Sequence, residues 1–161
     1  MEKEKRRTKK KAEAKQSFCE LPAKPLKAGK PADSAFYRHQ RACQWKGVKD
    51  EPYKAKGDDW ARIVRKVLIG GRGETAKFQV RYFEISSGGN SSLEKHRHEH
   101  VVICLRGRGL VRIGTRKRAM QYLDIAYIAP DTPHQLLNPN QEPFGFLCIV
   151  NARRVRPKLL A

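Results

Sequence analysis

The chain has 161 residues, enough for one domain with a sizeable hydrophobic core and short appendages. Charged residues make up 32% of it and the formal net charge is +19, so non-specific association with polyanions is expected at low salt. No apolar run approaches the length of a membrane span, and no apolar segment of the signal-peptide kind follows the charged N-terminus. We therefore expect a cytoplasmic protein that does not enter a membrane.

The first 35 residues are predicted to be a disordered basic tail and linker. Residues 1–30 hold 11 Lys/Arg and 4 Asp/Glu, a net charge of +7, and few apolar side chains. No helix-turn-helix, zinc finger or RNA-binding aromatic motif accompanies this charge. A solvated basic surface is therefore favoured over a dedicated nucleic-acid-binding segment.

Residues 36–70 are predicted to form an N-terminal arm that packs on the domain that follows. Phe36, Tyr37 and Trp45 are aromatic side chains that need an apolar surface. The stretch 61–69 suits either a helix or a strand. Residues 36–60 are also aromatic enough to be exchanged between the subunits of a homodimer.

From residue 71 to residue 155 the pattern indicates short β-strands separated by Gly, Pro and Asn turns, and residues 156–161 form a C-terminal tail. Aromatic and β-branched residues predominate in the expected strands. Many short strands without a long helix favour a β-sandwich or a barrel. The strands are expected at 77–85, 100–105, 110–113, 118–123, 124–128, 134–138 and 144–150.

The chain has four cysteines, and no two of them have C-x-x-C spacing. A reduced protein with free thiols is therefore the default expectation. Cys104 and Cys148 both fall in apolar, strand-like stretches. Their simplest interpretation is that of buried thiols that pack as small hydrophobic residues. A role beside a metal, or in redox chemistry, is the alternative.

The histidines carry the strongest functional signal. His96, His98 and His100 occupy alternate positions, so in an extended strand their side chains point to the same face, and His134 follows in a Pro-His-Gln sequence. Such a cluster repels itself when protonated, whereas neutral imidazole is a common metal ligand. We therefore predict a site for one divalent transition metal: Fe, Mn, Ni, Cu or Zn.

Two stretches resemble the conserved motifs of the cupin family. In residues 88–109 a glycine turn leads into the histidine cluster, then an apolar strand and a Leu-x-Gly turn. In residues 124–138 an Asp precedes an apolar strand, a proline and a Pro-His pair with an Asn four residues on. The resemblance covers about residues 77–150. It implies an all-β fold, a double-stranded β-helix (jelly-roll) barrel with a divalent metal inside it.

The resemblance implies that His96, His100 and His134 hold the metal, and it leaves the fourth ligand open. Counting back from Gly107 places the family's ligand positions on Glu94, His96 and His100. A shortened loop would instead bring all three alternating histidines onto the metal. Glu94 and His98 are thus the two candidates for the fourth position.

Four further residues are candidates for contacts with the substrate or with the metal ligands. The amides of Gln135 and Asn138 could orient ligands or bound water. Strand alternation sends either Arg81 or Tyr82 inward, and we favour an outward, solvated Arg81. If it pointed inward, Arg81 would anchor a carboxylate or a phosphate.

The favoured function is that of a small-molecule metalloenzyme of the isomerase, dioxygenase or decarboxylase type. Its substrate would lie in the barrel, where the metal would act as a Lewis acid or activate O₂. A non-catalytic, ligand-binding or sensory cupin is the alternative. A nucleic-acid-associated basic protein with a structural barrel is the second alternative.

Overall fold

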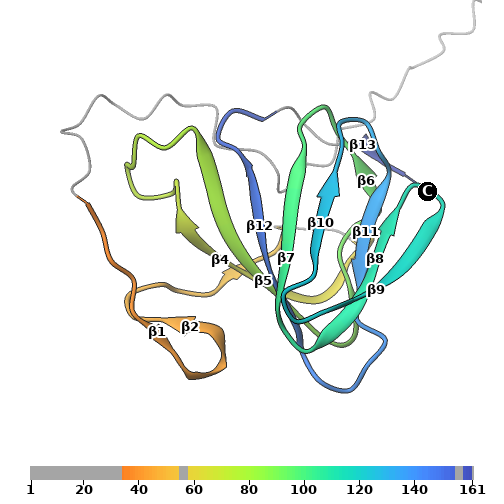
Figure 1. Ribbon diagram of the computed structural model, residues 1–161, viewed down its shortest axis with the longest axis horizontal. Coiled ribbons are helices and arrows are strands. Elements are labelled where there is room, and N and C mark those ends of the chain that lie inside the picture. Colours follow the sequence, from red (N-terminus) through yellow and green to blue (C-terminus); the bar gives the residue numbers. More distant parts are fainter. Residues whose placement is uncertain (1–33, 55–57, 155–157, 161) are drawn as a thin grey trace, which may run out of the picture.

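The computed structural model describes residues 34–54, 58–154 and 158–160, so the predicted basic tail lies almost entirely outside the described residues. Within them the chain is all-β apart from one short 3-10 turn, η1 (Arg41–Cys43). Figure 1 shows the strands wrapped into a barrel. They are β1 (His39–Gln40), β2 (Gln44–Trp45), β3 (Glu51–Pro52), β4 (Ala61–Ile69), β5 (Phe78–Asn90), β6 (Glu94–Lys95), β7 (His100–Arg106), β8 (Arg108–Ile113), β9 (Arg116–Gln121), β10 (Ile125–Ile128), β11 (His134–Leu137), β12 (Phe144–Asn151) and β13 (Lys158–Leu159).

One large antiparallel sheet forms the barrel. Its strands follow the order β10-β7-β12-β5-β11-β6-β13, with β4 added to β5 and the β8–β9 hairpin added to β11. Neighbours in this order are distant in the sequence, as in a jelly roll rather than a simple meander. The predicted all-β jelly-roll barrel is confirmed.

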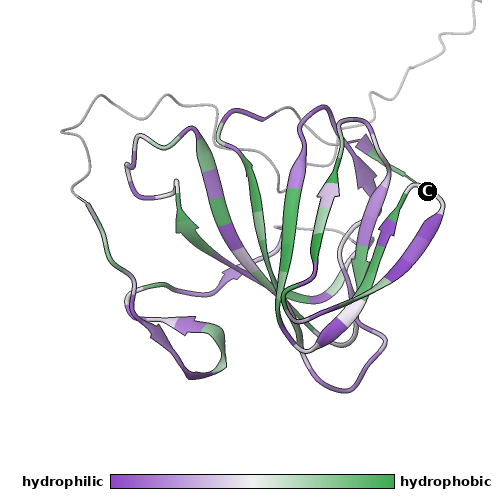
Figure 2. Cartoon of the chain, viewed as in Figure 1, coloured by the Kyte–Doolittle hydropathy of each residue, from purple (hydrophilic) through white to green (hydrophobic). Residues whose placement is uncertain are grey.

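The core follows from strand alternation. In β7 and β12 every second side chain is buried, and these inner residues meet inside the barrel. Figure 2 shows hydrophobic residues on the central strands and hydrophilic residues on β9. Burying one large apolar side chain stabilises the fold by about 1.5–3 kcal/mol. The core includes Phe83, Ile85, Val102, Cys104, Phe144 and Phe146.

Strand β5 is longer than the sequence predicts. The sequence predicts a strand at 77–85, yet β5 continues to Asn90. Gly88 has a φ of +70°, and a Cβ atom on Gly89 would lie 2.6 Å from the Ala61 carbonyl oxygen. The pairing with β4 shifts register here. The glycines therefore permit an irregular, closely packed strand end instead of a turn.

The N-terminal arm packs on the outer face of β5. The Trp45 ring meets the Tyr82 ring edge-on, with 5.3 Å between centroids. Tyr37 and Cys43 pack against the same buried cluster, which also contains Val48. Strand β5 is therefore covered on both faces, by the barrel core and by the arm. Among the described residues no helix is long and apolar enough to cross a membrane.

Candidate metal centre

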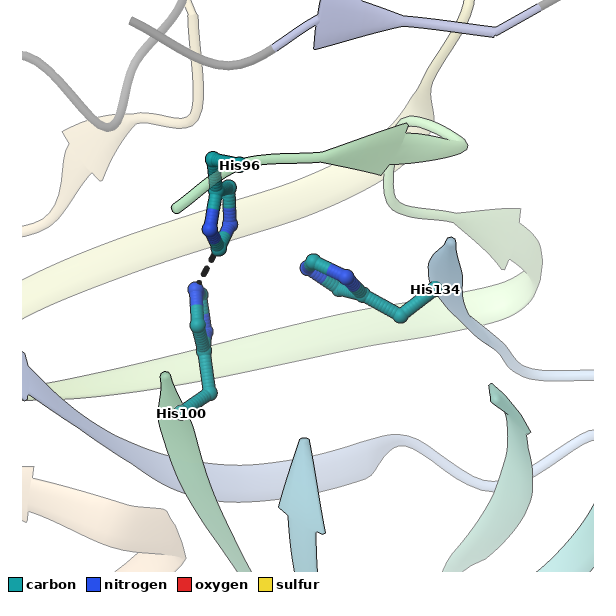
Figure 3. A group of neighbouring side chains, drawn as sticks. All are labelled: His96, His100 and His134. Carbon is teal, nitrogen blue, oxygen red and sulfur yellow. Dashed lines mark hydrogen bonds between the residues drawn. The ribbon is translucent and has the colours of Figure 1, made fainter. Parts of the chain in front are cut away.

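Three buried histidines converge inside the barrel from separate elements (Figure 3). His96 follows β6, His100 begins β7 and His134 begins β11. Each offers a ring nitrogen, and these three atoms all lie within 4.8 Å of one another. The Nε2 atoms of His96 and His100 are 2.8 Å apart. Two imidazoles on one ion need a nitrogen separation of about 3 Å, given metal–nitrogen bonds of about 2.1 Å.

The backbone orients two of these rings. Nδ1 of His96 lies 2.8 Å from the His98 carbonyl oxygen, and Nδ1 of His134 lies 2.9 Å from the Thr132 carbonyl oxygen. A carbonyl oxygen only accepts hydrogen bonds, so each Nδ1 carries a proton and donates it. Each Nε2 is then left with a free lone pair. The donor set therefore fits a divalent transition metal.

The surroundings keep His96 and His100 neutral. Burial, together with the nearby His134 and Arg81, lowers the pKa of His96 to about 4. Burial, followed by the charges of His134 and Arg81, holds the pKa of His100 well below its usual value. Neutral imidazole is the form that binds a metal, so both rings could bind one at physiological pH.

His98 differs from the other three. Its ring stacks on the His96 ring, with 3.6 Å between centroids and 2° between planes. The chain bends at residues 97–98, so residues 96–100 do not form the extended segment in which alternate side chains would share a face. The bend, rather than strand alternation, brings His96 and His100 together. Both ring nitrogens of His98 are buried and have no hydrogen-bond partner among the described residues, and burial is the main cause that lowers its pKa to about 3.

Glu94 lies beside the histidines, but a lysine holds its carboxylate. It is the register partner of His134, and its Oε2 is 3.4 Å from the Lys54 ammonium. Lys54 also donates to the Ser92 hydroxyl and lies 3.3 Å from the Asp59 carboxylate. Lys54 is buried, and sequence reasoning missed it because no local pattern marks a lysine that pairs across 40 residues.

The expectation of an outward, solvated Arg81 is wrong. Arg81 is only 1% exposed, and its guanidinium lies 5.2 Å from the centroid of the Phe83 ring. Its Nη2 donates to the Cys148 Sγ at 3.3 Å. Tyr82, next along the strand, packs against the arm and donates to Glu84 at 2.7 Å. Both residues are buried because both faces of β5 are covered.

A cavity of about 40 Å³ adjoins the histidines, enough for a few water molecules or a small chemical group. Arg81 and Glu94 contribute the charged parts of its wall, and His100 and His134 contribute the imidazoles. Its remaining lining combines apolar side chains with three hydroxyl groups. These residues are Tyr53, Phe83, Ser91, Ser92, Leu136 and Phe146.

The two amide candidates hold the loops around the site. Gln135 donates to the Ser91 carbonyl oxygen at 3.0 Å. Asn138 donates to the carbonyl oxygens of Ile85 and Glu142, both at 2.8 Å, and accepts from the backbone amide of Asn140. Neither amide lines the cavity. Asn138 in particular uses its amide group to fix the chain that follows β11.

Comparison with known proteins agrees with this geometry. The family model described as a cupin domain matches residues 81–150. A curated relative from Rhodospirillum rubrum, named 1-methylthio-D-xylulose 5-phosphate methylsulfurylase, is 39% identical over 128 residues, which are 79% of this chain and 81% of the relative. The chain belongs to the cupin family.

Two solved cupin structures resemble this cupin closely. A cupin-2 domain from Rhodospirillum rubrum is 35% identical, with a TM-score of 0.67, over 83% of this chain and 84% of its own. A cupin 2 conserved barrel domain protein from Rhodopseudomonas palustris is 33% identical, with a TM-score of 0.73, over 79% and 87%. Both similarities extend well beyond the two motifs.

Proposed function

We propose that this cupin is a metal-dependent enzyme that acts on a small anionic molecule. The observation that carries the proposal is the convergence of His96, His100 and His134 on one point beside a cavity that also contains Arg81. The three histidines would hold one divalent transition metal. When bound, such a metal supplies Lewis-acid chemistry or activates O₂.

The charges around the histidines favour an anionic substrate. Arg81 is permanently protonated, and its positive charge contributes to the lowered pKa of His96, His98 and His100. The positive charge of Arg154 acts on His98 in the same direction. A guanidinium in an enclosed, low-dielectric wall attracts a carboxylate or a phosphate more strongly than one in water.

The Rhodospirillum rubrum relative supports a more specific substrate class. Its name is that of an enzyme for a 5-phosphate of a modified xylulose. Because the two chains share 39% identity over most of both lengths, we extend the class, a phosphorylated sugar derivative, to this cupin. The reaction is proposed to be of the isomerase, dioxygenase or decarboxylase type, carried out where the substrate meets the histidines.

Metal content tests the proposal first. Full-length protein without an affinity tag should contain about one transition metal per chain by elemental mass spectrometry. The double variant His96→Ala/His134→Ala should lose it. His39→Ala is the matched control, because His39 is exposed on β1 in the arm, and it should retain the metal. No metal in any variant, with none taken up from Fe, Mn, Ni or Zn, would overturn the proposal.

Turnover is the second test. The metal-loaded protein is offered a panel of phosphorylated sugars, and product formation is followed by mass spectrometry. Product that depends on His96 and His134 supports an enzyme. Saturable binding without product would instead support the ligand-binding or sensory alternative.

A further inference from the structure

The inner face of the β8–β9 hairpin ends in two arginines. In β9, Arg116 is the register partner of Ile113, and Arg118 is the register partner of Val111. Register partners in an antiparallel pair project from the same face of the sheet. Val111 belongs to the barrel core, and Ile113 packs against it. Arg116 and Arg118 therefore project from the inner face of the barrel wall, although both are exposed.

The register continues from Arg116 to the metal centre. Ile113 is also paired with His134, and His134 with Glu94. Arg116, Ile113, His134 and Glu94 thus form one row across β9, β8, β11 and β6, which lie side by side in Figure 1. Neighbouring strands are about 4.8 Å apart, so the backbones of Arg116 and His134 are about 10 Å apart. An arginine side chain can cover much of that distance.

The hairpin is fixed relative to the histidine. The backbone amide of Gly114, in the turn between β8 and β9, donates to the Pro133 carbonyl oxygen at 2.7 Å. Pro133 immediately precedes His134. Movement of the hairpin tip therefore moves the loop that places the metal ligand. The two arginines are held in register with the site.

The chemistry of the two side chains is that of a phosphate site. Guanidinium groups bind phosphate through paired hydrogen bonds, and two of them satisfy several oxygens of one phosphate. Neither Arg116 nor Arg118 forms an ion pair with any residue in the described part of the chain. Their hydrogen-bond donors are thus available at the rim of the barrel.

We propose that Arg116 and Arg118 bind the phosphate group of the substrate at the barrel rim. The other end of the substrate then reaches the three histidines and the cavity beside Arg81. The identity of the ligand as a substrate rests on the proposed function, whereas the phosphate site itself requires no metal. The ligand class is a sugar or polyol phosphate long enough to extend from the rim to the histidines.

The test compares two double variants of the same hairpin in the full-length protein. Arg116→Gln/Arg118→Gln removes the inner pair. Arg108→Gln/Lys117→Gln removes the same charge from the outer face, because Lys117 alternates with the inner arginines and Arg108 pairs with outward Gln121. D-ribose 5-phosphate is the probe, D-ribose is the neutral control, and affinity is measured by isothermal titration calorimetry.

The inner variant should bind D-ribose 5-phosphate at least 10-fold more weakly, and the outer variant within about 2-fold of the wild type. D-ribose should not bind measurably. Equal losses in the two variants would mean general attraction to a basic surface and would overturn the proposal. So would a loss confined to Arg81→Gln, which would place the phosphate inside the barrel, or a wild type that shows no saturable binding.

Metal measurements separate this proposal from the proposed function. The inner variant should keep the metal content of the wild type. The His96→Ala/His134→Ala variant should still bind D-ribose 5-phosphate. Replacing Arg116 and Arg118 in that variant should weaken this binding as it does in the wild type. A wild type that binds no metal but binds phosphate through Arg116 and Arg118 would refute the enzyme alone. A wild type that binds the metal but whose phosphate binding does not depend on Arg116 and Arg118 would refute the rim site alone.

Discussion

His100 and Cys148 face each other across β7 and β12, with 3.1 Å between the imidazole Nδ1 and the Sγ atom. Once Nε2 of His100 holds a metal, its Nδ1 carries a proton that it donates to the sulfur. Such a partner fixes the orientation of a ligand ring, and loss of one typically costs 10- to 100-fold in metal affinity. We therefore propose that Cys148 positions His100 for metal binding.

Replacing Cys148 by Ala should weaken metal binding by about 10-fold or more. Cys148→Ser should recover part of the loss, because a hydroxyl can accept the same hydrogen bond. Zn²⁺ affinity is measured by competition with a chelator. Cys104→Ala is the matched control, since Cys104 is a buried strand cysteine whose sulfur faces the carbonyl oxygens of Arg106 and Gly107. Equal losses in both alanine variants would show that packing, not the hydrogen bond, is responsible.

Arg81 is predicted to contribute to the low pKa of His96. Its positive charge disfavours protonation of His96, so Arg81→Met, which removes the charge at similar length, should raise that pKa above about 4. Histidine NMR titration of the metal-free protein measures the shift. Arg106→Met is the control, because Arg106 is paired with Glu84. An unchanged pKa of His96 in Arg81→Met would show that the charge of Arg81 does not contribute to it.

The identity of the fourth metal ligand can be tested with variants that remove the ligand atoms but keep a side chain of similar size. Glu94 is held by Lys54, and the His98 ring is stacked on His96, so neither belongs to the group of three converging nitrogens. We expect Glu94→Gln and His98→Leu both to retain about one metal per chain, whereas His100→Ala loses it. Metal content by elemental mass spectrometry decides this. A clear drop in only one of the two variants would identify that residue as the fourth ligand.

The strands of the barrel could be predicted from the sequence because the patterns that indicate a strand are local. Alternation in His100–Arg106 and the apolar run ending at Val150 each predict a strand without knowledge of the partner strand. The burial of Arg81 could not be predicted from local patterns. Its burial beside Cys148, and that of Tyr82 under Trp45, depend on segments tens of residues away.

The same reasoning applies to the site. His96, His100 and His134 were identified because an imidazole cluster is chemically unusual, although a bend at residues 97–98, and not the alternation of an extended chain, brings His96 and His100 together. Lys54 carries no such signal, since a lone lysine is ordinarily a solvated side chain. Only the three-dimensional pairing with Glu94 and Ser92 shows that it belongs to the site.

The metal-free protein should lose stability as the pH falls from about 6.5 towards 4. An unfolded histidine has a pKa near 6.5, whereas burial lowers the pKa of folded His96 to about 4 and that of His98 to about 3. Between these values the unfolded state binds more protons, so the free energy of unfolding decreases with falling pH. The contribution is fully present above pH 6.5.

Urea unfolding at pH 7 and pH 5 measures this effect, and we expect a decrease of roughly 2–4 kcal/mol for the cluster after allowance for solvent screening. His98→Leu should lessen the pH dependence, because it removes one titrating ring. It should also stabilise the protein at pH 5, since both nitrogens of that ring are buried without a hydrogen-bond partner among the described residues. His39→Ala, outside the barrel, should leave the pH dependence unchanged. A stability that is flat between pH 7 and pH 5 would show that the histidines protonate in the folded state as readily as in the unfolded chain.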